Sequence, residues 1–261
     1  MKLEVIGCVG NSPTAEDVCP CYLVSHGATR LLLECGTGSL HLLQQRVALR
    51  DLSAVVITHM HSDHFLDLVP LAGRLLVEQQ STGQARRLRI LLPPGGKAIL
   101  EDIRDLLVRH RLTILTRKMF EVLAIEEFAQ PSRVRIGDMT VHLSAPVEHD
   151  VITSAVRVEA GGKALCYSGD CAPCEAIEAS ARGVDLFLCG AAYAQRPAKR
   201  TILHMSPEEA GEIAARAGVK RLVLTKFSRS DAAWKQAYLP RARETFVGEV
   251  TLAQHGLVVE V

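Results

Sequence analysis

No stretch of this chain is apolar over the roughly 18 residues that a transmembrane helix needs, and no segment is of low complexity. The N-terminus starts with a pattern typical of a strand and lacks the hydrophobic region of a signal peptide, which favours a cytoplasmic location. A basic excess is also missing, since 30 Lys and Arg face 29 Asp and Glu. Dedicated nucleic-acid binders usually carry such an excess, so the charge balance argues against a nucleic-acid partner.

The chain also lacks a cysteine framework. Its eight cysteines include the close pairs Cys19 with Cys21 and Cys171 with Cys174, but the two spacings differ and no histidine pair accompanies either. This argues against a structural zinc, and in a cytoplasmic protein we expect free thiols rather than disulfides. The chain has enough apolar residues for a hydrophobic core, because 48% of the 261 residues are hydrophobic. That is enough for one large domain or for two fused halves.

The most informative segment is 58–64, with the sequence THMHSDH. It follows the apolar run Ala54–Ile57, which predicts a buried strand. A polar turn at the end of a strand can project several side chains into one small volume. Imidazole nitrogen and carboxylate oxygen are ordinary ligands of zinc and similar metals. The first two histidines can flank one ion while Asp63 and His64 turn toward a second, so the segment predicts a metal site.

This segment resembles the H-x-H-x-D-H motif of the metallo-β-lactamase superfamily. The resemblance implies an α/β fold, a four-layer αβ/βα sandwich with a mono- or dinuclear metal site at one edge. It also implies ligands further along the chain. His149, in the loop after a predicted strand at 141–146, fits the expected third histidine, and Asp170 in the sequence Ser-Gly-Asp fits the expected bridging carboxylate. His142, within that strand, is predicted to be a packing or surface residue.

The order of predicted elements occurs twice along the chain. In each set, two strands joined by a Gly-containing hairpin precede a Gly turn, a helical stretch and another buried strand. The sets occupy residues 21–57 and 154–189. We therefore expect a single domain over 1–261, built from similar halves of approximately 1–130 and 131–261, with the ligands meeting at the seam between them.

The last expected ligand is where the chain departs from the family. Relatives commonly end a late strand with Leu-Thr-His, but this chain has Lys226 after Leu224 and Thr225. A protonated lysine has no lone pair to donate and repels a cation. Either the second metal is weak or absent, or Lys226 loses its proton beside the metals, or its ammonium binds an anionic substrate. We favour a weakened second site with Lys226 facing the substrate; a lysine that points to solvent is the remaining alternative.

Two further segments matter. The family's upstream Asp-x-Gly turn is Glu34-Cys35-Gly36 here. The longer side chain of Glu34 could hold the His-rich loop in place without touching the metal.

His204 lies two residues before Ser206, the predicted N-cap of a helix. The segment resembles the His-x-Ser/Thr of the phosphodiesterase branch, which includes tRNA 3′-end processing enzymes and cyclic-nucleotide phosphodiesterases. The resemblance implies that His204 contacts phosphate or donates a proton to the leaving group.

The resemblance thus implies metal-assisted hydrolysis of a phosphodiester, with a small cyclic nucleotide or a related phosphoester as the expected substrate. The cofactor would be a divalent metal, with zinc expected ahead of manganese or iron, and one or two ions per chain. The first metal would be held by His59, His61 and His149, and the second by Asp63, His64 and the bridging Asp170. Catalytic roles would fall to Asp63, His204 and Lys226.

Three alternatives stay open at this point. One is a tRNA 3′-processing endonuclease, although the sequence contains no long Gly/Pro-rich arm. Another is hydrolysis of a lactone or thioester on the same metals. The third is a non-catalytic or specialised binding protein with a degenerate second metal site, which the lysine at position 226 would explain. We expect a small anionic substrate as the partner and no membrane contact, and the sequence leaves a homodimer open.

Overall fold

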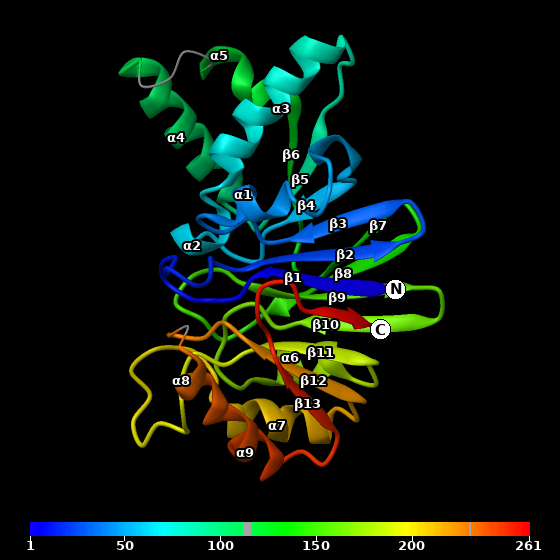
Figure 1. The fold of residues 1–261 in the computed structure, drawn as a ribbon, viewed down its shortest axis with the longest axis vertical. Coiled ribbons are helices and arrows are strands. Elements are labelled where there is room, and N and C mark those ends of the chain that lie inside the picture. Colours follow the sequence, from blue (N-terminus) through cyan, green and yellow to red (C-terminus); the bar gives the residue numbers. More distant parts are fainter. Residues whose placement is uncertain (112–115, 230) are drawn as a thin grey trace.

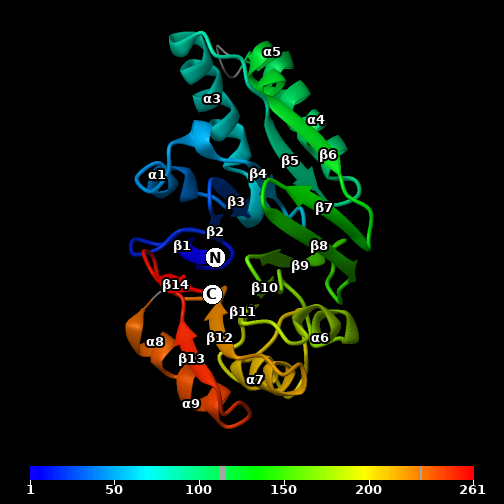
Figure 2. The ribbon, with the colours of Figure 1, turned by 90° about the vertical axis from the view of Figure 1, so that its right-hand side faces the viewer.

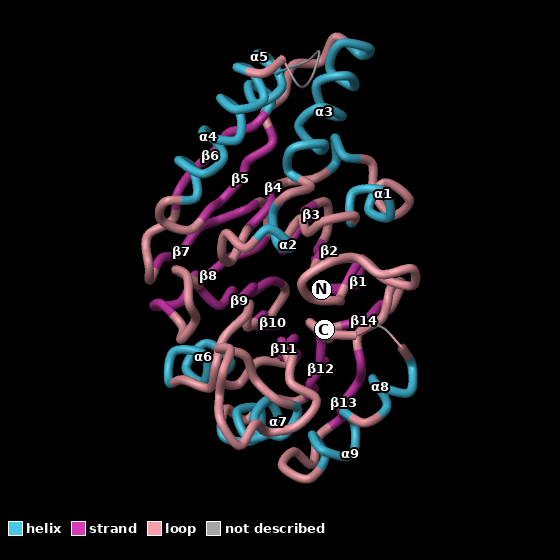
Figure 3. Tube along the Cα trace, turned by 90° about the vertical axis from the view of Figure 1, so that its left-hand side faces the viewer, coloured by secondary structure: helices cyan, strands magenta, loops and turns pink. Residues whose placement is uncertain are grey.

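The computed structural model describes the whole chain except residues 112–115 and 230. Its strands form two seven-stranded sheets that face each other, and helices cover the outer side of each (Figure 1). Figure 3 shows the same layers from another side, with the strands in the middle and most helices at the two ends. The predicted α/β four-layer sandwich is therefore confirmed.

The first sheet has the strand order β14-β1-β2-β3-β4-β5-β6. Its antiparallel part ends at β3, and β3 to β6 run parallel to one another. The bounds are β1 Lys2–Gly7, β2 Cys21–His26, β3 Thr29–Leu33, β4 Ala54–Val56, β5 Leu88–Leu92, β6 Leu123–Glu127 and β14 Val258–Glu260. Strand β14 pairs with β1, so the two termini lie side by side (Figure 2).

The second sheet has the order β13-β12-β11-β10-β9-β8-β7 and repeats this plan. Strands β7 to β10 are antiparallel, and β10 to β13 are parallel. The bounds are β7 Ser132–Ile136, β8 Met139–Pro146, β9 Ser154–Ala160, β10 Lys163–Tyr167, β11 Leu186–Gly190, β12 Arg221–Thr225 and β13 Glu249–Leu252. The predicted repeat is thus present as two similar sheets, while the assignment of the chain to one domain stays a prediction.

The helices divide between the two sheets (Figure 1). Those on the first sheet are α1 Ser39–Leu43, α2 Ser62–Phe65, α3 Leu68–Thr82, α4 Gly96–Arg109 and α5 Thr116–Met119, with the short 3-10 helices η1 Leu49–Asp51 and η2 Phe120–Val122. Those on the second are α6 Glu175–Ala181, α7 Pro207–Arg216, α8 Ala232–Gln236 and α9 Tyr238–Arg243. Helix α7 has the predicted capping box, in which the side chains of Ser206 and Glu209 each bind the other's backbone N–H. Among the described residues no helix is long and apolar enough to cross a membrane.

The burial pattern explains why the sheets face each other. Strand β8 alternates buried Met139, Val141 and Leu143 with partly exposed residues, which is the period of a half-buried strand. Strand β4 is buried throughout, as expected for a parallel strand covered on both faces. One apolar cluster fills the space between the sheets and continues under α6, α7 and α9, and another lies between the first sheet and its helices. His142 lies on the partly exposed side of β8, 3.3 Å from Glu159, as a surface residue.

Candidate metal centre

The candidate site lies where the carboxyl ends of the parallel strands meet. In the first sheet, Glu34 follows β3 and segment 58–64 follows β4. In the second sheet, Asp170 follows β10 and Lys226 follows β12, while His149 lies in the loop after β8. Ligand sites of α/β sheets typically form at this edge. The fold brings together all six predicted ligands, which are His59, His61, Asp63, His64, His149 and Asp170.

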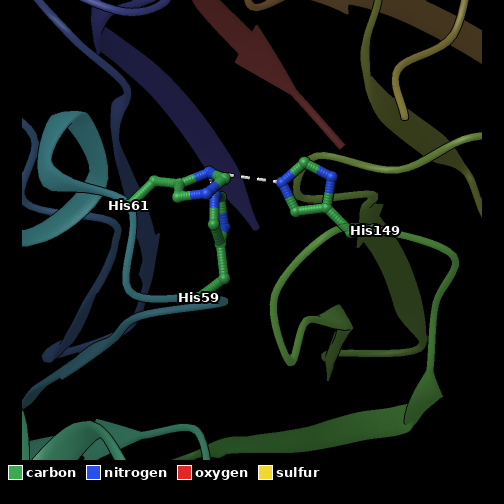
Figure 4. Close-up of side chains that lie close together, drawn as sticks. All are labelled: His59, His61 and His149. Carbon is green, nitrogen blue, oxygen red and sulfur yellow. Dashed lines mark hydrogen bonds between the residues drawn. The ribbon is translucent and has the colours of Figure 1, made fainter. Parts of the chain in front are cut away.

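We call His59, His61 and His149 the imidazole cluster. Nε2 of His59 lies 3.1 Å from Nδ1 of His61, and Nε2 of His149 lies 3.3 Å from the same atom. Figure 4 shows the three rings converging, with His149 reaching in from the opposite half of the molecule. Nitrogen ligands at 2.0–2.1 Å from a tetrahedral zinc lie about 3.3 to 3.4 Å from one another. The spacing is therefore that of a ligand set around one ion.

Hydrogen bonds behind two of these rings fix which nitrogen carries the proton. The Thr58 hydroxyl donates to Oε1 of Glu34, so it accepts from Nδ1–H of His59 at 2.9 Å. Nδ1 of His149 lies 3.1 Å from the carbonyl oxygen of Leu203, which can only accept. In both rings Nε2 is left with a free lone pair facing the cluster, which is the arrangement that typically orients metal-binding histidines.

Burial keeps these rings neutral. It lowers the pKa of His59 well below the usual range, and it also lowers the pKa of His149. Neutral imidazole is the form that binds a divalent metal. His59 and His149 therefore present Nε2 lone pairs toward Nδ1 of His61, and a cation between the rings could accept them.

We call Asp63, His64 and Asp170 the carboxylate cluster, which adjoins the imidazole cluster through Asp170. Oδ2 of Asp170 lies 3.3 Å from Nε2 of His64 and 3.9 Å from Nε2 of His59. The side chain of Asp170 is 1% exposed, and neither oxygen accepts a hydrogen bond of regular geometry. Burial alone would raise its pKa, but Lys226 and His64 outweigh burial and hold that pKa well below the usual range. Such a carboxylate beside the three converging imidazoles fits a further metal ligand.

Lys226 lies at the centre of the carboxylate cluster. Its Nζ is 2.6 Å from Oδ2 of Asp63, 2.8 Å from Oδ2 of Asp170 and 2.9 Å from Nε2 of His64. The residue is 2% exposed, so the alternative in which Lys226 points to solvent is wrong. Burial alone would lower the pKa of Lys226, but Asp170 and Asp63 outweigh burial and raise it above the usual value. Lys226 is thus an ammonium held by two carboxylates.

Three residues of the site adopt a backbone conformation that side chains rarely take. The φ angles of Asn11, Glu34 and Lys226 are 68°, 64° and 59°, and Arg111 is the one other described non-glycine residue of this kind. Such conformations cost about 1–3 kcal/mol each and gather at functional sites. Here they aim the Asn11 N–H at Asp63, 2.9 Å from Oδ2, and the Glu34 carboxylate at Nδ1 of His64, 3.1 Å from Oε1.

A cavity of about 280 Å³ opens over both clusters. His204 stands in its wall, with Nδ1 3.7 Å from Oδ2 of Asp170 and its ring centre 5.3 Å from that of His149. The structure therefore places His204 and Lys226 at the same cavity as the predicted ligands. Larger hollows lie beside α3 and α4, but none of the predicted ligands lines them.

Sequence reasoning assigned no role to Thr58, Asn11 or Asp150. The carboxylate of Asp150 is 65% exposed at the cavity mouth, with Oδ1 3.1 Å from Nε2 of His149. Thr58 and Asp150 stand directly beside predicted ligands in the chain, which is a signal that could have found them. Asn11 belongs to no motif and reaches the site only because its loop folds back over Lys226.

The chain matches a family and a close structural relative over most or all of its length. Residues 29–227 match the sequence model of the β-lactamase superfamily domain. The chain is 28% identical over 263 residues to the probable metallo-hydrolase YhfI of Bacillus subtilis, with 100% of both sequences covered. The crystal structure of YhfI, a metallo-β-lactamase fold protein, superposes with a TM-score of 0.85 at 26% identity, covering 100% of this chain and 99% of that one.

Two more relatives widen the comparison. The chain is 30% identical over 252 residues to ribonuclease Z of Mycobacterium bovis (strain BCG / Pasteur 1173P2), covering 87% of this chain and 86% of that sequence. The structure of a diphosphatase from the PhnP family superposes with a TM-score of 0.73, covering 100% of this chain and 96% of that one. Its identity of 17% restricts that likeness to the fold. All these matches agree with the two-sheet architecture described above.

Proposed function

This chain belongs to the metallo-β-lactamase superfamily, as segment 58–64 predicted, and on that premise we propose that it is a metal-dependent hydrolase that cleaves phosphodiesters. The observation that carries the proposal is the imidazole cluster, in which three ring nitrogens converge beside the buried carboxylate of Asp170. His59, His61 and His149 would hold the metal, with Asp170 as a further ligand. Imidazole suits zinc and also iron, so zinc is our first expectation, with manganese and iron to be tested beside it.

A metal in this position would supply Lewis acidity, which acidifies water and neutralises charge that develops on phosphorus-bound oxygens. The rest of the chemistry falls to the chain's own side chains. Thr58 and Leu203 hold His59 and His149 with their lone pairs facing inward. Asp170 keeps its negative charge at the boundary between the two clusters, 3.3 Å from His64.

We assign the leaving-group proton to His204. It stands in the cavity wall, where a bound phosphoester would meet it, and it is not needed to hold the metal. Burial lowers the pKa of His204, whereas Asp170, 3.7 Å from its Nδ1, favours the protonated form that can donate. A positioned histidine of this kind contributes about 10²–10⁴-fold to a hydrolytic rate.

The size and charge of the cavity support a small anionic substrate, such as a cyclic nucleotide or a related phosphoester. Its volume of about 280 Å³ lies just below the range of about 300–1,000 Å³ that is usual for small-molecule sites. The chain's net charge of +1 and the absence of a Gly/Pro-rich arm favour a small substrate over a transfer RNA. The small substrate and the cytoplasmic location stay predictions. Whether the protein forms a homodimer stays open.

A second candidate function is cleavage of RNA. The observation in its favour is the 30% identity to ribonuclease Z over 87% of this chain. The same metal centre would serve either substrate, because both contain a phosphodiester.

The test is a substrate screen of purified protein loaded with zinc, manganese or iron(II). The panel contains cyclic nucleotides, bis(p-nitrophenyl) phosphate, a precursor tRNA, a lactone and a thioester. We expect hydrolysis of phosphodiesters, and we expect His204→Ala to lower kcat by about 100-fold or more while metal content stays unchanged. Ready hydrolysis of the lactone or the thioester without any phosphodiester cleavage would refute the proposal.

A further inference from the structure

We propose that this protein works with one metal ion, and that the ammonium of Lys226 permanently fills the position of a second. The inference rests on the proposed function only in assuming that the imidazole cluster binds a metal. It concerns the neighbouring carboxylate cluster, where the side chains present do not fit a metal because a cation of the chain itself already lies between them.

The donor atoms of the carboxylate cluster are arranged as they would be around an ion. Nε2 of His64 lies 3.6 Å from Oδ2 of Asp63 and 3.3 Å from Oδ2 of Asp170. These separations are close to those of ligands about 2.0–2.2 Å from a common metal. Nζ of Lys226 occupies the middle of this set, 2.6 to 2.9 Å from each of the three atoms.

The charge of the ammonium is matched by its surroundings as well as its position. A lysine ammonium has three N–H donors and no acceptor. Nζ of Lys226 donates a hydrogen bond to Oδ2 of Asp63 and forms an ion pair with Oδ2 of Asp170. The ammonium is therefore held by two carboxylates of the protein itself. Lys226 is a positioning residue, not the substrate-binding residue that the sequence favoured.

The chain makes room for this lysine. A Cβ atom on Gly10 would lie 3.0 Å from Cε and 3.2 Å from Cδ of Lys226, so a larger residue at position 10 would crowd the aliphatic stem. On the other side, a Cβ atom on Gly190 would lie 3.5 Å from Cβ of Lys226. The loop is fixed by Phe227, whose backbone exchanges hydrogen bonds with Cys8 and Gly10. The stem of Lys226 is thus enclosed beside Gly10 and Gly190, which holds its ammonium between the two carboxylates.

The lysine also compensates the charge of Asp170, the residue at which the two clusters meet. Oδ2 of Asp170 lies 2.8 Å from the ammonium and 3.9 Å from Nε2 of His59. A second ion in the carboxylate cluster would have to share this oxygen with the ammonium that already lies against it. We therefore infer a stoichiometry of one.

The experiment is a count of tightly bound metal per chain, by native mass spectrometry and by calorimetric titration of metal-free protein with zinc. We expect one ion in the wild type. Lys226→His removes the ammonium and supplies an imidazole ligand, and we expect it to raise the count to two. Lys226→Ala tests the same point without a new ligand, and we expect a second ion of weaker affinity.

Lys235 provides the matched control, because it is another buried lysine paired with an aspartate, 3.4 Å from Asp17, and it does not contact either cluster. Lys235→Met should leave the count at one. Two tightly bound ions in the wild type would overturn the inference while leaving metal-dependent hydrolysis intact. No bound ion at all would instead refute the proposed function and, with it, the single-metal centre. Because the readout is a count, an unexpected substrate specificity would not affect it.

Discussion

The imidazole cluster and the carboxylate cluster lie side by side between the two halves of the molecule, yet they differ in what lies between their side chains. In the imidazole cluster, ring nitrogens face one another at 3.1 and 3.3 Å, and no described group lies between them. In the carboxylate cluster the lone pairs face Lys226. The first arrangement leaves a position for a cation from solution, and the second carries a cation that is covalently part of the chain.

The difference has an energetic consequence. Removing one partner of a buried ion pair typically costs 3–5 kcal/mol, because the other charge is left uncompensated. The carboxylate cluster is therefore stable only with its lysine and does not depend on metal. In the imidazole cluster His59 and His149 are neutral, so loss of the metal leaves no uncompensated charge on these two rings. The concentration of available metal should therefore control activity through occupancy of the imidazole cluster alone.

The largest expected effect comes from His59→Ala, which removes one of the three converging nitrogens. We expect the count of bound metal to fall from one to near zero and hydrolysis to fall to the background rate. Calorimetry and a phosphodiester assay would measure this. Loss of even a supporting group behind a ligand typically costs 10–100-fold in metal affinity, and loss of the ligand itself should cost more.

His142→Ala is the control for that variant. His142 is a partly exposed histidine on β8 that contacts Glu159 rather than the site. It should keep full metal content and full activity. Full metal occupancy in purified His59→Ala protein would show that the imidazole cluster is not the metal site, and the contrast between the two clusters would then have no basis.

A smaller effect should follow from Thr58→Val, which keeps the shape of the side chain but removes the hydroxyl between Glu34 and His59. The ring of His59 would lose the acceptor that fixes its tautomer. We expect metal affinity to fall about 10–100-fold. Thr58→Ser retains the hydroxyl and should bind metal like the wild type. Zinc affinity would be measured by competition with a chelator. Equal affinity in the two variants would show that the Thr58 hydroxyl does not contribute to metal binding.

Much of this comparison was visible in the sequence. The apolar run at 54–57 followed by THMHSDH predicted both the strand and the ligand turn, since a buried parallel strand and a metal turn leave distinct residue patterns. The repeated order of elements predicted the two similar sheets. The departure at Lys226 was recognised because a lysine cannot replace a metal-binding histidine.

Other features depended on contacts between distant parts of the chain. Glu34 and Thr58 lie 24 positions apart, and only the pairing of β3 with β4 makes one the acceptor of the other. The direction of the Lys226 side chain was not predictable, because it depends on a positive φ angle and on Gly10, more than two hundred residues away. Whether that ammonium faces a substrate or two carboxylates depends on the tertiary structure.

The smallest expected effect, and the most specific one, concerns Gly10. In Gly10→Ala the new methyl group would lie 3.0 Å from Cε of Lys226, so the stem must shift by a few tenths of an ångström. We expect the free energy of unfolding to fall by about 1–3 kcal/mol, as is typical for overpacking. Gly73→Ala is the control, because Met119 is 3.9 Å away at the nearest point and a helix such as α3 favours alanine. Chemical denaturation would measure both.

A double-mutant cycle separates contact with the lysine from general strain in the loop. If Gly10 is required only to make room for the stem of Lys226, the alanine should cost little once the lysine is gone. Gly10→Ala in a Lys226→Ala background should therefore lower the free energy of unfolding by much less than it does alone, with a coupling energy in the range of about 0.5–3 kcal/mol that is usual for residues in contact. Additive losses would show that the loop of Gly10 and the ammonium are energetically independent. The enclosed lysine of the carboxylate cluster would then no longer explain the glycine opposite it.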